Sequence, residues 1–313
     1  MDDTAGAAGP EDAAASAASA RSLAAGELPL EARRRLAQET GGRRLWATDL
    51  SVDELLLVEA EGYEPLGLVL GSSVYHVGWQ RTGFWGPNTQ ELTTVTEAHL
   101  HARALAMGRM EREAAALGAH GVVGVRLTTK GYEGSSDLLE FTAIGTAVRV
   151  RGAPPPARPF LSDLSGEDFW TLRQAGYTPV GLAMGFCAYL VYPGKYPYTT
   201  GNLYSYGNLE MSEFTRGIYE ARRLALARLR AELPALGASG VAGMKIEIKK
   251  HMHEREVNNT HYLLLQIDFF ALGTAIAPGH PPAQTAARPR AVLNMSGLRP
   301  VRSRLAGAEL SNR

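Results

Sequence analysis

Apolar residues recur at the spacing of an α-helix in two long stretches of the chain. The apolar positions of these stretches are Leu100, Met107, Met110, Ala114 and Leu117, then Tyr219, Leu226, Leu229, Leu233 and Leu236. Residues three, four or seven apart lie on one face of a helix, so each stretch predicts an amphipathic helix packed on a sheet. Gly118 and Gly237 follow where a left-handed C-cap belongs. Pro234 should bend the second helix or end it slightly early, because proline cannot donate to the helical ladder.

Segments rich in Val, Leu and Tyr lie on both sides of each predicted helix, and they predict strands. The predicted strands are residues 65–77, 122–130 and 138–150 around the first helix, and 179–191, 244–252 and 262–275 around the second. A short helix should precede each first strand, because Ser51 with Glu54, and Ser165 with Asp168, have the spacing of a capping box. Each half of the chain therefore predicts a β-α-β-β unit.

The two halves share this order because the chain repeats itself. Residues 49–75 align with 163–189, residues 116–127 with 235–246, and residues 141–148 with 269–276, at offsets of 114, 119 and 128. We therefore predict an α+β fold of two tandem β-α-β-β domains, each a small antiparallel sheet with one long helix. One helix covers only one face of such a sheet, so we expect oligomerisation to complete the core.

Composition divides the rest of the chain into flanking segments and a linker. The predicted boundaries are 1–44 for an Ala-rich flexible region, 45–150 for the first domain, 151–160 for a Pro-rich linker, 161–277 for the second domain and 278–313 for a Pro/Arg-rich tail. We expect residues 1–25 to be disordered, and residues 31–38 to form a short surface helix. The linker should be semi-rigid. The tail is interpreted as a docking strand or a disordered segment.

Charge and cysteine content narrow the classes of function. The formal net charge is zero, so a broad electrostatic attraction to nucleic acid or an anionic membrane is not expected. No window of about twenty residues is apolar enough to span a bilayer, and the first residues do not form a secretory signal. A cytoplasmic protein is expected. The single cysteine, Cys187, excludes an intramolecular disulfide, and its apolar surroundings favour a buried side chain over a reactive thiol.

Short motifs that recur in both halves carry a resemblance to a known family. The first half contains GSSV at 71–74, LGAHGVVGVR at 117–126 and EFTAIGTAV at 140–148, and the second keeps LGA at 236–238 and ALGTA at 271–275. These repeats resemble the YbjQ family, whose members carry a heavy-metal-binding label. The resemblance implies a fold similar to dodecin subunits and ring-like oligomers, typically pentamers. It brings no agreed set of site residues, and no catalytic constellation is recognisable, so a non-enzymatic protein is expected.

The histidine-rich stretch KKHMHEREVNNTH, residues 249–261, is the best metal candidate in the sequence. Alternation over residues 244–249 predicts that even-numbered side chains face the core and that His251 and His253 face outward. With His261 across a hairpin, they predict a site for a divalent transition metal. The alternative is a polar hairpin or a pH-sensitive subunit contact, and the first half has no histidine there. The isolated histidines are interpreted as structural: His76, His99, His101 and His120.

Two aromatic loops are the other candidate site, and both lie between the first strand and the long helix of their half. Their aromatic residues are Trp79, Phe84, Trp85, Tyr192, Tyr196, Tyr198, Tyr204 and Tyr206. Aromatic side chains give a large contact area at low entropic cost, which suits a small molecule or a protein partner. Alternatively, the loops pack on each other across repeats or subunits. We therefore expect a cytoplasmic, oligomeric binding or assembly protein, with a metal-binding module as the alternative.

Overall fold

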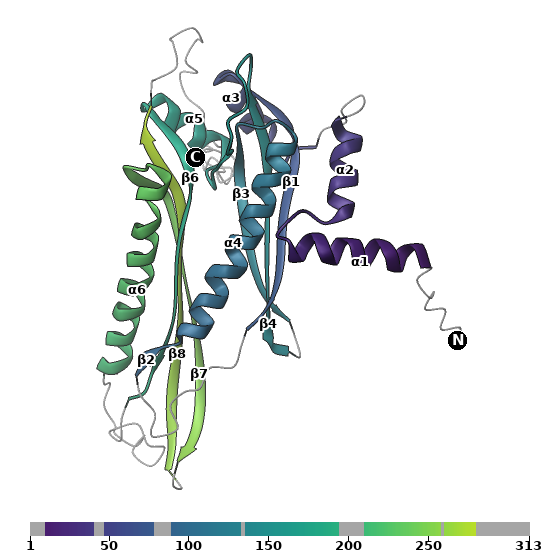
Figure 1. Cartoon of the computed structure of the whole chain (residues 1–313). Helices are drawn as coiled ribbons and strands as arrows, with labels where there is room; N and C mark the ends of the chain where they lie inside the picture. The colour runs from purple at the N-terminus through teal and green to yellow at the C-terminus, as the bar shows by residue number, and fades with distance from the viewer. Residues whose placement is uncertain are drawn as a thin grey trace, which may run out of the picture. The chain divides into compact units, whose positions relative to one another are not determined.

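The computed structural model describes residues 10–40, 47–77, 89–132, 135–193, 210–257 and 260–279. The chain divides into two units, Met1–Pro282 and Ala283–Arg313. The second unit lies outside the described residues, so the features below belong to the first. It contains both helices and sheets, which confirms the α+β class (Figure 1).

The first half of the chain forms a four-stranded sheet with the order β1-β4-β3-β5. Its elements are α3 (Val52–Ala60), β1 (Tyr63–His76), α4 (Thr93–Ala116), β3 (Gly121–Tyr132) and β4 (Ser135–Val150). Strand β4 pairs antiparallel with β1 on one side and with β3 on the other. Helix α4 packs on β1 and β4, as the apolar stripe predicted.

The second half forms a sheet with the order β2-β6-β8-β7. Its elements are α5 (Gly166–Gln174), β6 (Tyr177–Val191), α6 (Ser212–Glu232), the 3-10 turn η1 (Pro234–Leu236), β7 (Gly240–Val257) and β8 (Thr260–Pro278). Strand β8 is the centre of the antiparallel pairing. Helix α6 packs on β6 and β8, so the two halves have the same β-α-β-β order.

Each sheet receives its last strand from a segment outside its own half. Strand β5 (Phe160–Leu161) precedes the second half but pairs in parallel with Gly121 and Val122 of β3. Strand β2 (Gln90–Glu91) precedes α4 of the first half but pairs with Leu190 and Tyr189 of β6. Backbone hydrogen bonds therefore tie the two halves together.

The predicted helix ends are confirmed. Ser51 and Glu54 form a reciprocal capping box at α3, and Ser165 accepts from the backbone N–H of Asp168 at α5. Gly118 and Gly237 have φ angles of 73° and 64°, the left-handed conformation that favours glycine. Helix α6 ends at Glu232, just before the turn that Pro234 begins.

The two sheets differ in how many of their faces are covered. Strand β6 is buried at every residue from Gly181 to Ala188, whereas burial in β1 follows a broken alternation. Continuous burial means that both faces of a strand are covered. Helix α6 covers one face of β6, and α4 lies between the sheets against the other (Figure 1). The first sheet has α4 on one face and leaves much of the other exposed.

Two expectations for the chain's flexible and edge regions are wrong. Residues 10–24 were expected to be disordered, but they form helix α1 (Pro10–Ala24). Alanine has the highest helix propensity, and α1 is held to α2 (Leu30–Thr40) by a bond from Ser19 Oγ to Glu31. The predicted surface helix is therefore α2, and its Leu36 is buried in the core.

The second wrong expectation concerns the face of β7. Its even-numbered residues were expected to face the core, but Met244, Ile246 and Ile248 are exposed by 48%, 49% and 40%. Strand β7 is the last strand of its sheet, and no described element covers this face. The division into two tandem domains stays a prediction.

Candidate functional site

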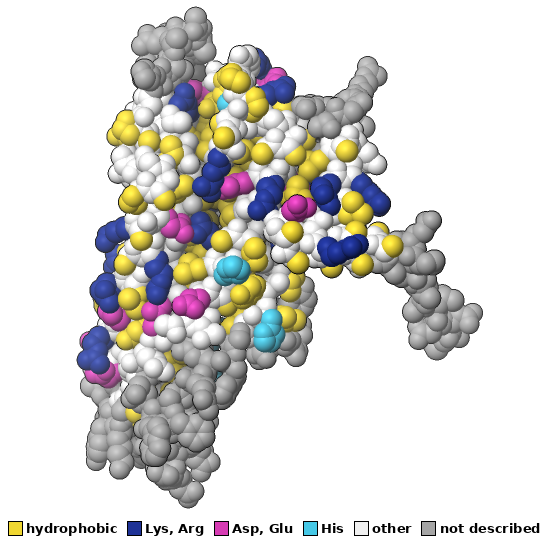
Figure 2. Space-filling model, viewed as in Figure 1, with side chains coloured by type: hydrophobic (Ala, Val, Ile, Leu, Met, Phe, Trp, Pro, Cys, Tyr) yellow, Lys and Arg dark blue, Asp and Glu magenta, His cyan; other side chains and the backbone are white. Residues whose placement is uncertain are grey.

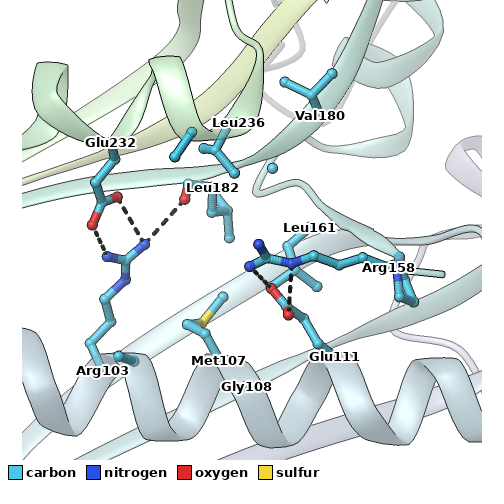
Figure 3. Close-up of a pocket in the computed structure, with 14 residues that line it drawn as sticks. Arg103, Met107, Gly108, Glu111, Arg158, Leu161, Val180, Leu182, Glu232 and Leu236 are labelled. Atoms are coloured by element: carbon cyan, nitrogen blue, oxygen red, sulfur yellow. Dashed lines mark hydrogen bonds and ion pairs between the residues drawn. The ribbon is translucent and has the colours of Figure 1, made fainter.

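The contact region between the two halves, here called the joint, contains a cavity of about 290 Å³. Helix α4, the segment that leads into β5, β6 and the end of α6 surround it (Figure 3). Its apolar lining includes Met107, Leu161 and Leu182. Its charged groups form two pairs, Arg103 with Glu232 and Arg158 with Glu111, at 2.7 and 2.8 Å. The pair of Arg103 and Glu232 joins the two halves, and the pair of Arg158 and Glu111 joins the linker to α4.

Arg103 is the main polar contact of the joint, and it is only 9% exposed. It donates from Nη1 to Glu232 Oε1 at 2.7 Å and from Nη2 to the carbonyl oxygen of Leu182 at 3.1 Å. Glu232 Oε2 also accepts from the backbone N–H of Met184 at 2.9 Å. A guanidinium buried to this degree is tolerated because its charge is paired and hydrogen-bonded. The pair therefore fixes α4 against β6 and α6.

Arg103 was not among the residues that the sequence pattern singled out. It lies three residues after Leu100 and four before Met107, on the apolar stripe of the predicted helix. A charged residue in such a stripe is rare unless it is paired. That position was the signal in the sequence, but its partner Glu232 lies 129 residues away and only the fold brings them together.

Aromatic rings form a second part of the joint. Tyr63 contacts Phe169 edge to face at 5.2 Å and Phe160 at 6.4 Å. His99 stacks on Phe186 with ring centres 4.0 Å apart. Burial lowers the pKa of His99, although its Nδ1 contact with the Val95 carbonyl opposes the shift. His99 therefore acts as a neutral aromatic ring, which agrees with the predicted structural role.

A repeated polar motif lies at the start of each half. The backbone N–H of Asp163 donates to Thr274 Oγ1 at 3.0 Å, and Lys245 Nζ lies 3.2 Å from Asp163 Oδ2. At the aligned positions, Asp49 donates to Thr146 Oγ1 at 3.1 Å and pairs with Arg126. A second cavity, of about 250 Å³, lies between the two motifs. Asp49 and Asp163 each have a cationic partner, so the motif acts as a structural clamp.

Comparison with known proteins assigns the family. A YbjQ family model, described as "Putative heavy-metal-binding", matches residues 59–151. The chain is 45% identical over 94 residues to a UPF0145 protein of Halorubrum lacusprofundi, which covers 29% of this chain and 88% of that protein. The chain belongs to the YbjQ-like family. No solved structure matches this YbjQ-like chain.

A longer relative extends beyond the family model. The YbjQ-like chain is 39% identical over 236 residues to a Mycobacterium tuberculosis protein named encapsulin nanocompartment protein Rv1762c. The alignment covers 74% of this chain and 85% of that protein. Because 236 residues exceed either predicted domain, the similarity reaches into both halves. The family model matches the first half alone, so the presence of two tandem copies stays a prediction.

The predicted metal ligands lie on the hairpin of β7 and β8. His251 and His253 are exposed on β7, and His251 Nε2 lies 3.5 Å from Asp268 Oδ2. The register pairs His253 with Leu264 and Glu256 with His261, so His261 is three positions, about 10 Å, along β8 from the residue opposite His253. The side chain of His261 lies outside the described part. Among the side chains that are described, no three His, Cys, Asp or Glu groups come together to hold a metal.

The aromatic loops fall almost entirely outside the described residues of the YbjQ-like chain. Seven of the eight predicted aromatic side chains are not described, and the exception is Tyr192. Its backbone N–H donates to Thr89 Oγ1, which donates to its carbonyl oxygen, both at 3.0 Å. Thr89 is near the end of the first loop (residues 79–90) and Tyr192 begins the second (residues 192–208), so one end of each loop lies beside the other.

The thiol of Cys187 lies in the core of the second half. Cys187 is fully buried, and burial raises the pKa of its thiol to about 12, so the prediction of a buried side chain is confirmed. On the face drawn in Figure 2, Lys and Arg side chains are interspersed with acidic and hydrophobic ones. No helix in the described ranges is long and apolar enough to cross a membrane.

Proposed function

We propose that this YbjQ-like chain is a non-enzymatic assembly protein whose copies join head to tail, each new contact repeating the joint. The observation that carries the proposal is the position of the exposed hydrophobic residues. Six of the ten large hydrophobics exposed in the described chain align with residues of the other half that are buried or packed in the joint: Leu70, Val74, Tyr177, Tyr219, Met244 and Ile246. Each half thus has an apolar face that resembles a buried face of the other half.

The open face of the second half is on β7 and α6. Met244 is 48% exposed, whereas the aligned Val125 is only 1% exposed. Ile246 is 49% exposed. The residue aligned with Ile246, Leu127, packs against the main core cluster. Tyr219 on α6 is 64% exposed, whereas the aligned Leu100 packs against the same cluster. In the first half, the second half covers the aligned residues of β3 and α4. A partner on the open face would cover Met244, Ile246 and Tyr219 in the same way.

The open face of the first half is on β1. Leu70 and Val74 are 43% and 54% exposed, but the aligned Met184 and Ala188 are fully buried against α4. The open face on β7 and α6 therefore matches the first-half side of the joint, and the open face on β1 matches the second-half side. One face of a copy can thus bind the other face of the next copy. Contacts of this kind are heterologous, so they close into a ring or extend as a filament.

Backbone groups at the sheet edge support the same pairing. Gly124 and Val125 donate from β3 to the carbonyl oxygens of Leu164 and Ser162. The aligned donors of β7 are Gly243 and Met244, on a strand whose outer side has no strand partner among the described residues. Thr48 and Leu50 of a second copy would supply the matching carbonyls. Unpaired edges of this kind favour strand addition.

The comparisons support an assembly-related or binding role. The name of the Mycobacterium tuberculosis relative places that protein with an encapsulin nanocompartment. If the copies close into a ring, each brings two sheets, so the ring contains an even number of sheets. The pentameric rings implied by the family resemblance contain five units, so whole chains of this kind would form a different ring.

Placing a charge on the open face of β7 tests the proposal. We expect Ile246→Asp to raise the concentration at which copies associate by at least about tenfold, because a buried carboxylate without a partner is strongly unfavourable. Sedimentation velocity over a concentration series measures this effect. Glu247→Lys is the matched control, because the aligned Thr128 stays exposed beside the joint. A wild-type chain that stays monomeric throughout the series, or equal association of Ile246→Asp, would contradict the proposal.

As a second candidate function, we propose a metal site on the β7–β8 hairpin, with His251, His253 and His261 as ligands. The contact between His251 and Asp268 supports it, because metal-bound imidazoles commonly donate to a carboxylate. Calorimetric titration with Zn²⁺, Cu²⁺ and Ni²⁺ should show binding that is lost when all three histidines are replaced by alanine. Binding of equal affinity in that triple variant would exclude these ligands.

The aromatic loops are the proposed surface for a small-molecule or protein partner. Support comes from the bonds between Thr89 and Tyr192, which bring the ends of both loops together. Large aromatic side chains gathered at one place suit a contact surface.

A further inference from the structure

We infer that α1 and α2 occupy the place of a partner helix: α2 covers part of the face of the first half to which α6 of a second copy binds, and it leaves when copies assemble. The inference rests on the proposed head-to-tail contact. The surface is the open face of β1, and α2 competes for it with α6 of a second copy. The contacts of α2 with the first sheet match those of α4 with the second sheet.

Arg35 of α2 contacts the first half through the same aligned positions that Arg103 of α4 contacts in the second half. Arg103 donates to Glu232 at 2.7 Å and to the Leu182 carbonyl at 3.1 Å. Arg35 donates to Glu113 at 2.6 Å and to the Leu68 carbonyl at 3.4 Å. The repeat aligns Glu113 with Glu232 and Leu68 with Leu182.

The acceptors are also held in the same way. Glu113 accepts from the backbone N–H of Leu70, and Glu232 from that of the aligned Met184, both at 2.9 Å. Two helices that are unrelated in sequence thus place an arginine at aligned positions of the two sheets. Helix α2 adds apolar cover through Leu36, which is 5% exposed.

A second copy has its own arginine for this place. Arg222 of α6 is aligned with Arg103, and it is exposed. In the joint, α4 of the first half lies on the second sheet, so α6 of another copy would lie on the first sheet in the same manner. Glu113 is nearly fully buried, so Arg35 and the partner's Arg222 would compete for one small site.

Helix α2 covers only part of this face, and the uncovered part fits the partner. Arg228 donates to the Phe186 carbonyl and pairs with Glu91 at 2.7 Å. The aligned Arg109 donates to the Ser72 carbonyl at 2.5 Å, but its buried Nε has no hydrogen-bond partner among the described residues. The residue aligned with Glu91 is Glu210, which is exposed. A second copy would therefore bring a carboxylate to Arg109.

The backbone contacts of the joint can also be repeated there. Leu92 donates to the Ala188 carbonyl at 2.7 Å, and Ala188 donates to Thr96 Oγ1 at 3.1 Å. The aligned residues are Met211, Val74 and Thr215, so the required hydroxyl and carbonyl are present. Val74 is 54% exposed. A partner can thus bind the open part first and then displace α2.

Removing the guanidinium of Arg35 tests whether α2 competes with a second copy or only stabilises the first half. We expect Arg35→Ala in the full chain to lower the concentration for association by about tenfold, because Glu113 loses its intramolecular partner. Arg34→Ala is the matched control, because Arg34 is an exposed arginine on the same helix turn. Glu210→Arg should weaken association, since it places a like charge against Arg109. Sedimentation velocity over one concentration series measures all four chains.

The outcomes distinguish this inference from the proposed function. If Ile246→Asp weakens association while Arg35→Ala leaves it unchanged or weakens it, the competition by α2 is wrong and head-to-tail assembly stands. If wild type and Arg35→Ala are both monomeric over the whole series, both ideas fail. If Arg34→Ala enhances association as much as Arg35→Ala does, the contact with Glu113 is not the cause.

Discussion

Gly185→Ala is expected to destabilise the folded chain by about 3 kcal/mol or more, because the new methyl group has no space. A Cβ at Gly185 would overlap the carbonyl oxygen of Ala225 on α6. Backbone on both sides cannot rotate away as a side chain can, so β6 and α6 must separate. Gly71 faces Ala106 of α4 in the same way, so Gly71→Ala should have a similar effect. Urea unfolding followed by circular dichroism measures the free energy of unfolding.

Gly108→Ala is the control for this prediction. A Cβ at Gly108, within α4, meets no atom within 4 Å. Alanine should therefore stabilise the helix by about 0.5–1 kcal/mol, through its higher propensity. A loss below about 1 kcal/mol for Gly185→Ala would mean that helix and sheet are not in close contact at this point.

Glu232→Ala is expected to destabilise the chain by about 2–3 kcal/mol, less than for a fully buried ion pair because the side chain of Glu232 is 35% exposed. The substitution leaves Arg103 without its counter-ion in the joint, where the side chain of Arg103 is 11% exposed. A guanidinium at this depth cannot regain full hydration. The loss should appear in urea unfolding of dilute protein, where association does not contribute.

The aligned substitution Glu113→Ala provides the comparison. Both glutamates accept one backbone N–H from their first strand, so that loss is common to the two variants. The partner of Glu113 is Arg35, whose side chain is 40% exposed and can return to water. We therefore expect Glu113→Ala to cost about 1–2 kcal/mol, less than Glu232→Ala. Equal losses would show that the burial of the arginine does not matter.

The joint explains why the two sheets of this YbjQ-like chain differ in burial. The second sheet has a helix on each face, so β6 is buried continuously. The first sheet has α4 on one face and α2 on part of the other, so Leu70 and Val74 remain exposed. The two halves contain matching elements, so the difference in burial comes from the helices that pack on each sheet.

The heavy-metal-binding description of the family is not explained by the histidine-rich hairpin. The first half, which the family model matches, has no histidine at the aligned hairpin. In the second half, the contact of His251 with Asp268 is a pair, and a tetrahedral site needs more ligands. If the hairpin binds a metal, the site belongs to the second half of this chain.

The sequence by itself determined the two β-α-β-β units of this protein, the short helix before each of them, and the order of these elements. Helical and alternating periodicities, a repeat with three offsets, Ser51 with Glu54, and Gly118 with Gly237 predicted the helices, strands and caps that the structure has. These features depend on residues a few positions apart, so local spacing and backbone preference are enough to specify them.

The tertiary structure decided which faces and edges meet. The exchange of β5 and β2, the pair of Arg103 with Glu232, and the use of α2 as a cover for the first sheet join residues that lie far apart in the chain. The exposed side of β7 has an apolar alternation that predicts a core, and whether that face is buried depends on a neighbour. A pattern specifies that a face is apolar; only the packing of another element, or another copy, determines what covers it.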